Sequence, residues 1–298
     1  MICGIPDFRL APDPYIGIEE DRDKGERLLQ ASEGRSYEEM LRYYYEITEE
    51  DPPDLARHWI AHSLAEPEIA RKVMRASGLL PQSRSSGLSL LDIGCSTGGL
   101  LIAADNAYEE LTGLDVAFRW LVLGQVRLLE AGVRAKMVCA NAESLPFAEA
   151  SFDVVTATDL AEHLRDAATA VRETARVLIP GGKTVWTTNN RFALLPDPQI
   201  RLWGVGYLPR RWQPAYVALR RTDLHIFKVQ PRSAREMRKL FEIGGLRNHY
   251  TEAAPIFAPH LGAMANRALR VYNRMRRWPL IAALSKCLGP RLWTLASR

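Results

Sequence analysis

The sequence lacks the features that mark secreted, metal-binding and membrane-spanning proteins. Its 298 residues include only four cysteines, Cys3, Cys95, Cys139 and Cys287, and these show no metal-ligand spacing. No apolar run reaches the roughly 18–20 residues that span a bilayer, and the N-terminus has no basic-then-apolar signal pattern. These absences favour a cytoplasmic globular protein with reduced thiols and no bound metal ion.

Acidic residues are scarce in the C-terminal third of the chain. Residues 191–298 hold 20 Lys and Arg but only 5 Asp and Glu, whereas residues 1–190 hold 19 Lys and Arg and 30 Asp and Glu. The modest net charge of +4 therefore hides a basic part and an acidic part. Such a division indicates that the C-terminal third either meets an acidic partner or packs against the acidic remainder.

A basic amphipathic helix is predicted over residues 261–277. Arg267, Arg270, Arg274 and Arg277 fall on one face, and apolar residues lie largely on the other. An anionic membrane surface fits such a face, which would make the protein peripheral to the membrane. RNA phosphates would fit as well, but no RNA-binding motif accompanies the helix, so we do not expect a nucleic-acid partner. The alternative is a solvated face without a partner.

Strands alternate with helices from about residue 88 onward, which predicts a doubly wound α/β fold with a parallel sheet. The strands are predicted at 88–93, 111–116, 134–140, 152–158 and 183–189, and the helices between them at 98–107, 117–131 and 166–178. Further along, a helix is predicted at 233–243 and strands at 246–252 and 291–297.

The rest of the chain shows no such alternation. Residues 1–35 are predicted to form an irregular arm, and helices are predicted at 36–47, 53–65 and 67–76. Residues 81–87 are predicted to be a polar linker. Residues 191–231 show no regular hydrophobic period. We therefore expect an N-terminal arm and helical lid (1–87), a core (88–190) and a substrate-side part (191–298) that completes the same domain.

Glycines and carboxylates follow the first two predicted strands. The stretch 90–99 turns from strand into helix through Gly94 and Gly98, and such a turn brings backbone N–H groups up to a nucleotide-like ligand. Asp115 ends the second strand, where a carboxylate suits two ribose hydroxyls. The two features together predict a nucleoside-containing ligand.

Polar residues also follow the third and fourth strands. Asn141 and Glu143 offer an amide and a carboxylate where a base edge would lie, and Asp159 and His163 follow the fourth strand. Because parallel strands end at one edge of a sheet, all of these side chains are expected at a single site.

These stretches together resemble the class I S-adenosylmethionine-dependent methyltransferases of the small-molecule type. Residues 92–98 are similar to the family's Asp-x-Gly-x-Gly-x-Gly signature, 141–147 to its Asp-Ala-Glu-x-Leu-Pro-Phe, and 176–182 to its Arg-Val-Leu-x-Pro-Gly-Gly. The likeness covers about residues 88–190 and is weaker beyond them. It implies S-adenosylmethionine as cofactor and a Rossmann-like seven-stranded sheet with a reversed last strand.

The resemblance also implies roles for the matched residues. The glycine-bearing turn would border the methionine and ribose portions, Asp115 would hold the ribose, and Val116 would lie against the adenine face. Asn141 and Ala142 would meet the adenine edge, and Asp159 would line the sulfonium end. The cofactor-binding residues expected in this way are Asp92, Gly94, Ser96, Thr97, Gly98, Asp115, Val116, Asn141, Ala142, Glu143 and Asp159.

Two of these positions depart from the family's pattern. Ser96 stands where the family has the middle glycine of its signature, which leaves the backbone less freedom. Asn141 replaces the usual aspartate, and its amide oxygen can still accept a hydrogen bond from the adenine amino group, without charge.

Candidate catalytic and substrate-binding residues are less sharply defined. His163 is the candidate general base, because the pKa of an imidazole, near 6.5, suits removal of a proton from a hydroxyl; its alternative is a packing role in the loop. His58 and His62 are four apart on a helix, but no third metal ligand is near in sequence. The candidate substrate-binding residues are Tyr43, His58, Trp59, Trp203 and Tyr207.

The function expected from these features is methyl transfer to a small or medium-sized acceptor, aromatic or amphipathic, in small-molecule biosynthesis. O-methylation is favoured over N- or C-methylation. Two alternatives stay open. The acceptor could be a lipid or isoprenoid-linked molecule at a membrane surface, or the fold could use the cofactor for cyclisation or elimination without methyl transfer. The sequence does not indicate an oligomeric state.

Overall fold

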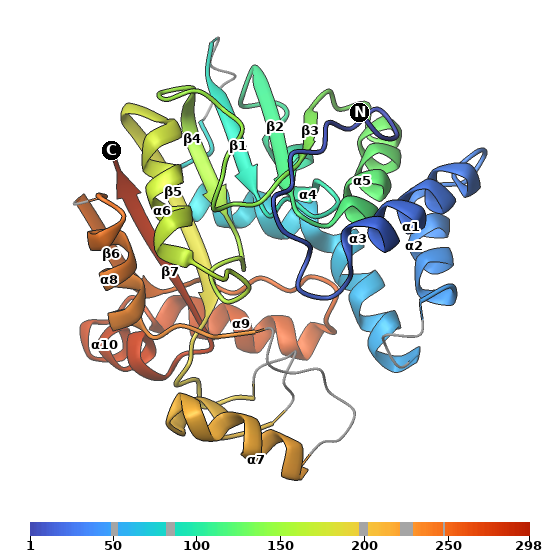
Figure 1. Ribbon diagram of the computed structural model, residues 1–298. Helices are drawn as coiled ribbons and strands as arrows, with labels where there is room; N and C mark the ends of the chain where they lie inside the picture. The colour runs from blue at the N-terminus through green and yellow to red at the C-terminus, as the bar shows by residue number, and fades with distance from the viewer. Residues whose placement is uncertain (49–52, 82–86, 197–201, 221–228, 247) are drawn as a thin grey trace.

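The centre of the molecule is a seven-stranded sheet (Figure 1). The computed structural model describes residues 1–48, 53–81, 87–196, 202–220, 229–246 and 248–298. The strands are β1 (Ser89–Ile93), β2 (Glu110–Asp115), β3 (Lys136–Cys139), β4 (Phe152–Ala157), β5 (Leu178–Asn189), β6 (Asn248–Ala253) and β7 (Arg291–Ser297), in the order β3-β2-β1-β4-β5-β7-β6. β7 is antiparallel to both of its neighbours, β5 and β6. The predicted fold class, with its reversed last strand, is confirmed.

Helices cover both faces of the sheet. Trp186 of β5 is fully buried on one face and meets Phe241 edge to face at 5.9 Å, whereas Phe118 and Leu28 are fully buried on the other. The first face is covered by α6 (Ala167–Val177) and α8 (Ala234–Ile243). The second is covered by α4 (Gly99–Ala104) and α5 (Phe118–Glu130), with α1 (Ile18–Ala31), α2 (Tyr37–Glu46) and α3 (Pro53–Ala76) packed outside them.

Residues 18–31 form the helix α1, so the prediction of an irregular arm is wrong for this stretch. The buried side of α1 consists of Asp21, Gly25 and Leu28, which no apolar period would reveal. A Cβ atom at Gly25 would lie only 2.6 Å from the ring of Phe118, so the glycine permits close packing on α5. Asp21 accepts a hydrogen bond from the backbone N–H of Phe118 at 2.7 Å. The helix is therefore stabilised by contacts that are distant in sequence.

One continuous helix, α3, replaces the two predicted at 53–65 and 67–76. Pro67 lies inside it, and a proline within a helix leaves the carbonyl four residues earlier without its usual donor. That carbonyl belongs to Ser63, and the guanidinium of Arg127 on α5 donates a hydrogen bond to it. The helix continues through Pro67 because a side chain from another element satisfies the orphaned acceptor.

Other elements begin and end close to where they were predicted. α2 begins at a capping box in which Ser36 accepts from the N–H of Glu39 and the Glu39 carboxylate accepts from the N–H of Ser36. β5 begins at Leu178 rather than at residue 183, with irregular pairing near its start. Most of the predicted linker 81–87 lies outside the described residues.

Three helices lie below the sheet in Figure 1, on the side where β1, β4 and β5 end. They are α7 (Gln213–Arg220), α9 (Ala263–Met275) and α10 (Pro279–Leu288), of which α7 and α10 were not predicted. Two short 3-10 helices, at Val205–Tyr207 and Arg210–Trp212, precede α7. Among the residues that the structure describes, no helix combines the length and the apolar character needed to cross a membrane.

Candidate active site

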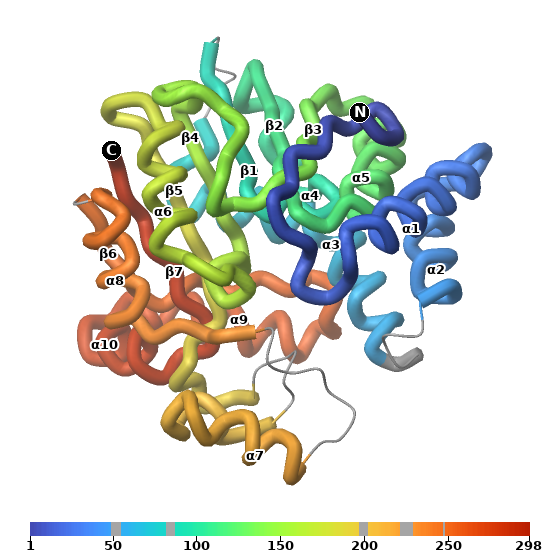
Figure 2. The backbone as a smooth tube through the Cα atoms, viewed as in Figure 1, coloured from blue at the N-terminus to red at the C-terminus, as the bar shows by residue number. Residues whose placement is uncertain are grey.

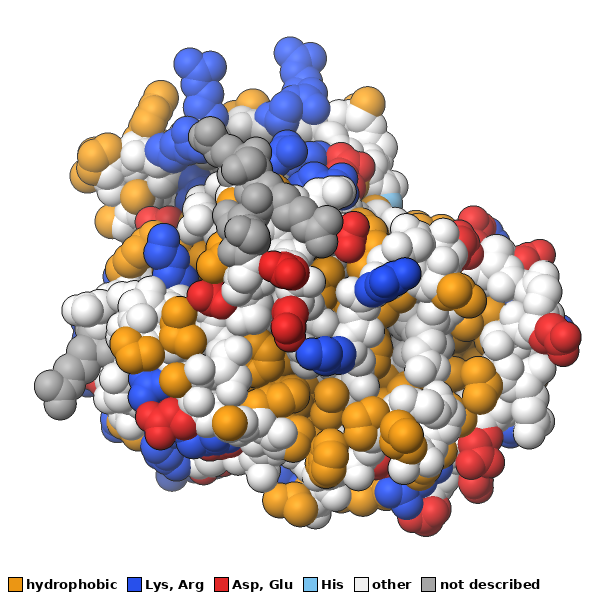
Figure 3. All heavy atoms as spheres, turned by 90° about the horizontal axis from the view of Figure 1, so that it is seen from above, with side chains coloured by type: hydrophobic (Ala, Val, Ile, Leu, Met, Phe, Trp, Pro, Cys, Tyr) orange, Lys and Arg blue, Asp and Glu red, His pale blue; other side chains and the backbone are white. Residues whose placement is uncertain are grey.

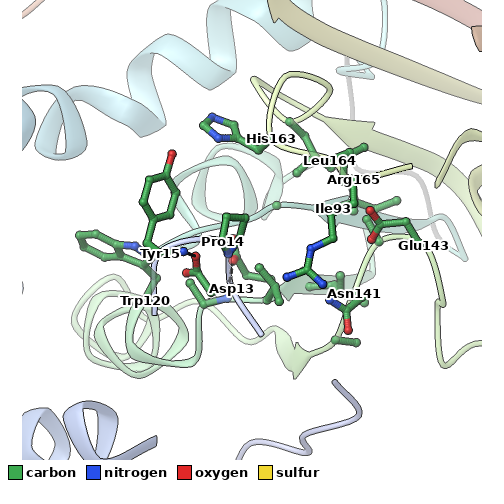
Figure 4. Close-up of a pocket in the computed structure, with 18 of the residues that line it drawn as sticks. Asp13, Pro14, Tyr15, Ile93, Trp120, Asn141, Glu143, His163, Leu164 and Arg165 are labelled. Carbon is green, nitrogen blue, oxygen red and sulfur yellow. Dashed lines mark hydrogen bonds between the residues drawn. The ribbon is translucent and has the colours of Figure 1, made fainter. Parts of the chain in front are cut away.

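A pocket of about 240 Å³ opens at the carboxyl ends of β1 to β4. The predicted residues that line it are Gly94, Asp115, Val116, Asn141, Ala142, Glu143, Asp159 and His163. In Figure 4, Asp13, Tyr15 and Trp120 lie at one side of the pocket, Asn141 and Glu143 at the other, and His163 at one end. The sheet thus brings together residues that are up to about 70 positions apart within the predicted core.

The carboxylate of Asp115 is held by two backbone groups. It accepts from the N–H of Ser96 and from the N–H of Ala117, both at 2.8 Å. Burial raises the pKa of Asp115 to about 6, although the two N–H donors oppose this shift. Each carboxylate oxygen can accept more than one hydrogen bond, so the fixed group can still receive donors from a ligand in the pocket.

The turn after β1 brings its backbone close to the pocket. Gly94 has a φ of +74°, and a Cβ atom there would lie 3.0 Å from the side chain of Leu160. Ser96, which stands in place of a family glycine, also has a positive φ, of 48°. A left-handed conformation costs a non-glycine residue about 1–2 kcal/mol. At Ser96 this conformation accompanies the hydrogen bond from its N–H to Asp115.

Four of the predicted cofactor residues, Asp92, Ser96, Thr97 and Gly98, do not belong to the lining of the pocket. Asp92 is buried beneath the turn, where its carboxylate accepts from Thr156 Oγ1 at 2.7 Å and burial raises its pKa to about 8. The hydroxyl of Thr97 is fully buried and bonds to the Tyr37 hydroxyl and to Arg127, each at 2.8 Å. These two side chains support the turn from below.

Asp159, which follows β4 and lines the pocket, is held by residues of β5 and β7. Its backbone N–H donates to Thr187 Oγ1 of β5 at 2.8 Å, and the same hydroxyl donates to its carboxylate at 2.9 Å. Arg291, the first residue of β7, forms an ion pair with the other carboxylate oxygen. Asp159 has a positive φ of 53°, which these contacts stabilise. The carboxylate is therefore fixed in position where it borders the pocket.

The N-terminal segment provides a wall of the pocket that the sequence did not reveal. Pro12, Asp13, Pro14 and Tyr15 line the cavity, opposite strand ends more than a hundred residues away. Figure 2 shows the first residues of the chain running past the end of β3 and across the front of the molecule before α1 begins. No local pattern distinguishes this wall from an irregular arm. The other lining residues missed are Ile93, Leu114, Ala117, Arg119, Trp120, Ala140, Thr158, Leu160, Leu164 and Arg165.

A cluster of aromatic rings lies between α3 and the segment before α9. The ring of His260 is 5.6 Å from that of His58 and 5.2 Å from that of His62, and Trp59 is 5.1 Å from His58. Burial, together with the nearby positive charge of Arg291, lowers the pKa of His62 to about 4. The rings lie outside the lining of the pocket, and the Arg291 whose charge acts on His62 also forms the ion pair with Asp159.

The remaining candidate substrate residues lie away from the pocket. Tyr43 of α2 lies under the guanidinium of Arg35 at 4.8 Å. Trp203 and Tyr207 have their rings 5.9 Å apart and donate to carbonyls of residues 192–194. They belong to a small packed unit with a minor hydrophobic core, next to a cavity of about 30 Å³. Within the described part of the chain, no group of three or more His, Cys, Asp or Glu is arranged to hold a metal ion.

The sequence of this pocket-bearing part matches a known family. Residues 91–186 match the methyltransferase domain family. The ubiquinone biosynthesis O-methyltransferase of Paracidovorax citrulli is 34% identical over 155 residues, which cover 48% of this chain and 64% of that protein. The protein of the same name from Pectobacterium carotovorum is 27% identical over 190 residues, which cover 63% of this chain and 67% of that protein. The chain carries a class I S-adenosylmethionine-dependent methyltransferase domain.

Solved structures agree with this methyltransferase fold. An S-adenosylmethionine-dependent methyltransferase from Mesorhizobium loti superposes with a TM-score of 0.52 and 18% identity, over 76% of this chain and 96% of the other. A phosphoethanolamine N-methyltransferase of Haemonchus contortus, in complex with S-adenosylmethionine, gives a TM-score of 0.51 and 17% identity, over 77% of this chain and 52% of the other. The matches to the relatives named above span about two thirds of those proteins' length.

The cofactor of this methyltransferase domain is S-adenosylmethionine, and the pocket fits it. A fixed carboxylate stands at the end of β2, with two of its acceptor positions used by backbone N–H groups and others directed to the cavity. Gly94 has a positive φ of 74°, which residues with a side chain rarely adopt, and a Cβ atom there would lie only 3.0 Å from Leu160, so the turn favours a glycine where the backbone approaches the pocket. The pocket also has apolar walls, which include Val116 and Trp120 and which suit the flat adenine ring of the cofactor.

Proposed function

We propose that this protein is an O-methyltransferase whose acceptor is a small or medium-sized amphipathic molecule held at an anionic membrane surface. The relatives named above are ubiquinone biosynthesis O-methyltransferases, which favours oxygen as the methylated atom and an isoprenoid-linked molecule as the acceptor. In this proposal, residues 88–190 hold the cofactor, residues 1–87 cover it, and residues 191–298 select the acceptor. The protein would act as a cytoplasmic enzyme that is peripheral to the membrane.

One observation carries this proposal: α9 attaches to the protein through polar side chains and turns apolar ones outward. Asn273 exchanges two hydrogen bonds with the backbone of Ile256, at 2.9 and 2.8 Å, and Arg276 donates to the carbonyl of Ala253 at 2.9 Å. Met264 is 86% exposed and Val271 is 52% exposed. Apolar side chains of α9 are therefore exposed to solvent.

Basic residues share this outward side with the apolar ones. Arg267, Arg270, Arg274 and Arg277 are all exposed, and α9 contains no acidic residue. Trp278 and Leu280, at the start of α10, are 58% and 87% exposed. Arginine beside exposed Trp, Leu and Met is the composition of a surface that lies in the interface of an anionic bilayer. We call this surface, residues 261–284, the basic apolar face.

The position of the basic apolar face suits delivery of an acceptor. α9 and α10 lie on the side of the sheet where β1, β4 and β5 end, which is the side of the cofactor pocket (Figure 1). The opposite end of the molecule, seen in Figure 3, carries acidic as well as basic side chains around a hydrophobic area, whereas α9 has no acidic residue. An amphipathic acceptor bound at the membrane would reach the sulfonium end of the pocket without passing through bulk water.

Methyl transfer requires mainly positioning from the protein. The bound cofactor supplies an electrophilic methyl group. Asp115 accepts hydrogen bonds from the ribose, and Asp159, fixed by Thr187 and Arg291, holds the part of the pocket wall that follows β4 in position. His163, at one end of the pocket in Figure 4, takes the proton from the acceptor's hydroxyl. Cyclisation or elimination on the same fold is the alternative, and it predicts no transfer of label from the cofactor.

The activity is tested with S-adenosylmethionine labelled in its methyl group and an isoprenoid-tailed phenol as acceptor. We expect label to enter the lipid-soluble product when the acceptor is presented in vesicles that contain phosphatidylglycerol. Neutral vesicles of phosphatidylcholine should support at least severalfold less product. Failure to label any hydroxyl acceptor, together with labelling of an amine acceptor, would contradict O-methylation.

Removing two arginines from the basic apolar face is expected to weaken vesicle binding roughly thirtyfold, because each basic residue near an anionic surface contributes about 1 kcal/mol. The change is Arg270→Gln with Arg277→Gln, and the measurement is co-sedimentation with phosphatidylglycerol vesicles at two salt concentrations. Arg42→Gln with Arg172→Gln removes the same charge from exposed positions of α2 and α6 and should leave binding unchanged. Equal binding by the two double variants would favour a solvated face.

A further inference from the structure

A second carboxylate, that of Asp13, stands in the wall of the cofactor pocket. Asp13 belongs to the N-terminal segment and is only 6% exposed, yet it lines the cavity together with Asp115. Burial is the main cause of the raised pKa of Asp115, and the negative charge of Asp13 adds to it. Figure 4 shows Asp13 across the pocket from Asn141 and Glu143. The pocket therefore contains two acidic side chains close enough for the charge of one to act on the other.

Asp13 is fixed in the same way as Asp115, with a protein donor on each carboxylate oxygen. Its Oδ1 accepts from the backbone N–H of Tyr15 at 2.8 Å, and its Oδ2 accepts from Arg119 at 2.9 Å. The guanidinium of Arg119 is itself buried and also donates to Asp21 at 2.8 Å. Each carboxylate oxygen can accept more than one hydrogen bond, so both acidic groups in the pocket keep acceptor capacity for a ligand.

The residues that precede this second carboxylate are bonded to two parts of the pocket wall. The amide oxygen of Asn141 accepts from the N–H of Leu10 at 2.8 Å and from the N–H of Ala11 at 3.1 Å. The amide nitrogen of Asn141 donates to the carbonyl of Ala11 at 3.1 Å. Arg165, in the loop after β4, donates to the carbonyl of Pro12 at 2.7 Å. Together with the buried ion pair, these contacts fix the acidic group in position, and a binding group fixed in advance loses little entropy when it binds.

Two neighbouring negative charges in a buried pocket disfavour each other unless a ligand supplies hydrogen-bond donors to them. The ribose of S-adenosylmethionine supplies such donors as a pair of adjacent hydroxyls. We propose that Asp115 and Asp13 divide this pair, so that each carboxylate accepts a hydrogen bond from one hydroxyl and Asp13 is a further cofactor-binding residue. Holding the ribose at both hydroxyls restricts its rotation and so orients the sulfonium end of the cofactor for methyl transfer.

The position of Asp13 favours the ribose over the other donors of the cofactor. The residues expected at the adenine edge follow β3, and the residue expected at the sulfonium end, Asp159, follows β4. Asp13 acts instead on Asp115, which ends β2. The proposal goes beyond the proposed function and depends on cofactor binding alone, so a wrong acceptor would leave its tests unaffected.

The test compares S-adenosylhomocysteine with its 2′-deoxy and 3′-deoxy analogues by isothermal titration calorimetry. Asp13→Asn should bind S-adenosylhomocysteine about tenfold to a hundredfold more weakly than the wild type does, the factor for loss of a charge-assisted hydrogen bond. For one of the two deoxy analogues, Asp13→Asn and the wild type should bind equally, because the hydroxyl that Asp13 recognises is missing. Asp115→Asn should show its smallest loss with the other analogue.

Asp21→Asn is the matched control. Asp21 is the other carboxylate partner of Arg119 and is fully buried, but it does not belong to the lining of the pocket. Each variant removes one ionised partner from the guanidinium, so both should lower the free energy of unfolding measured in urea. Only Asp13→Asn should change the affinity for S-adenosylhomocysteine. Equal losses of affinity in the two variants would overturn the proposal.

A second substitution, Asp13→Glu, decides the question if circular dichroism shows that Asp13→Asn is unfolded. Glutamate keeps a carboxylate for Arg119 but moves its oxygens by one methylene. We expect the affinity for S-adenosylhomocysteine to fall about tenfold and the loss to disappear with one of the two deoxy analogues. Unchanged affinity in a folded Asp13 variant would overturn the proposal. So would equal weakening of S-adenosylhomocysteine and both analogues, which would make Asp13 a purely structural partner of Arg119.

Discussion

Replacing Asp115 by alanine is expected to weaken S-adenosylmethionine binding by a factor on the order of a hundred or more, because charge-assisted hydrogen bonds contribute roughly 1.5–3 kcal/mol each. Asp115 is fixed by the N–H groups of Ser96 and Ala117 and borders the pocket, so its loss removes the proposed acceptor for the ribose hydroxyls and leaves two donors unpaired. Isothermal titration calorimetry on the folded variant measures the effect. An unchanged affinity would contradict the assignment of Asp115 to the ribose.

The same carboxylate predicts a pH dependence. Burial raises the pKa of Asp115 to about 6, so below this pH the group is neutral and binds hydroxyl donors less strongly. We expect the affinity for S-adenosylmethionine to fall as the pH drops below about 6. The effect on stability has the opposite sign. Between the ordinary pKa of an aspartate, about 3.9, and about 6, Asp115 keeps its proton in the folded state while the unfolded chain has lost it. The contribution of Asp115 to the free energy of unfolding therefore decreases as the pH rises through this interval.

Asp115→Asn is the matched control for this pH dependence. An asparagine keeps the size of the side chain and one acceptor oxygen but does not titrate. The affinity of this variant should be lower than that of the wild type at pH 7.5 and should lose the decline that begins near pH 6. If the decline persists in Asp115→Asn, it arises from another group, of which His163 in the same pocket is the first to test.

Replacing Arg119 by methionine is expected to lower the free energy of unfolding by about 3–5 kcal/mol, the cost of removing one partner from a buried ionic network. Arg119 Nη1 lies 2.9 Å from Asp13 and 2.8 Å from Asp21, and all three side chains are at most 4% exposed. Methionine leaves Asp13 without its ion-pair partner and Asp21 with Arg9 alone. Urea unfolding followed by circular dichroism gives the free energy.

An exposed arginine provides the control for this stability effect. Arg42 on α2 is paired with Glu38 four residues earlier, and both side chains are about half exposed. Arg42→Gln should change the free energy of unfolding by less than about 1 kcal/mol, because exposed pairs contribute little. A similar small change for Arg119→Met would mean that the charges of the N-terminal segment are solvated and do not form a buried network.

Much of the fold followed from the sequence because the relevant signals are local. The strands from β1 to β5 are short apolar runs, Ser36 and Ser233 are followed three residues later by glutamate, and both begin helices with capping boxes. The position of Asp115 at a strand end followed from the same runs. A glycine turn after one strand and a carboxylate after the next define neighbouring points at one edge of a parallel sheet, whatever surrounds them.

The sequence could not determine features whose physical cause is distant in the chain. α1 is held by a buried Asp21 that pairs with Arg119, and α3 continues through Pro67 because Arg127 satisfies Ser63. The outward turn of the apolar residues of α9 depends on Asn273 binding the backbone of residue 256. Hydrophobic periodicity and helix propensity describe one element at a time, whereas the structure of these elements depends on residues far away in the sequence.

The features of the site also fall into those that local signals predict and those that depend on distant contacts. The sequence by itself determined the sheet edge, the glycine turn and the carboxylate at Asp115, because strand order and turn chemistry fix them locally. Only the tertiary structure decided that Thr97 and Asp92 lie beneath the turn, and that Asn141, although it lines the pocket, bonds to the N-terminal segment. The reason is that a side chain's partners are set by whichever chain segment packs against it, and Leu10 and Ala11 lie about 130 residues from Asn141 in sequence.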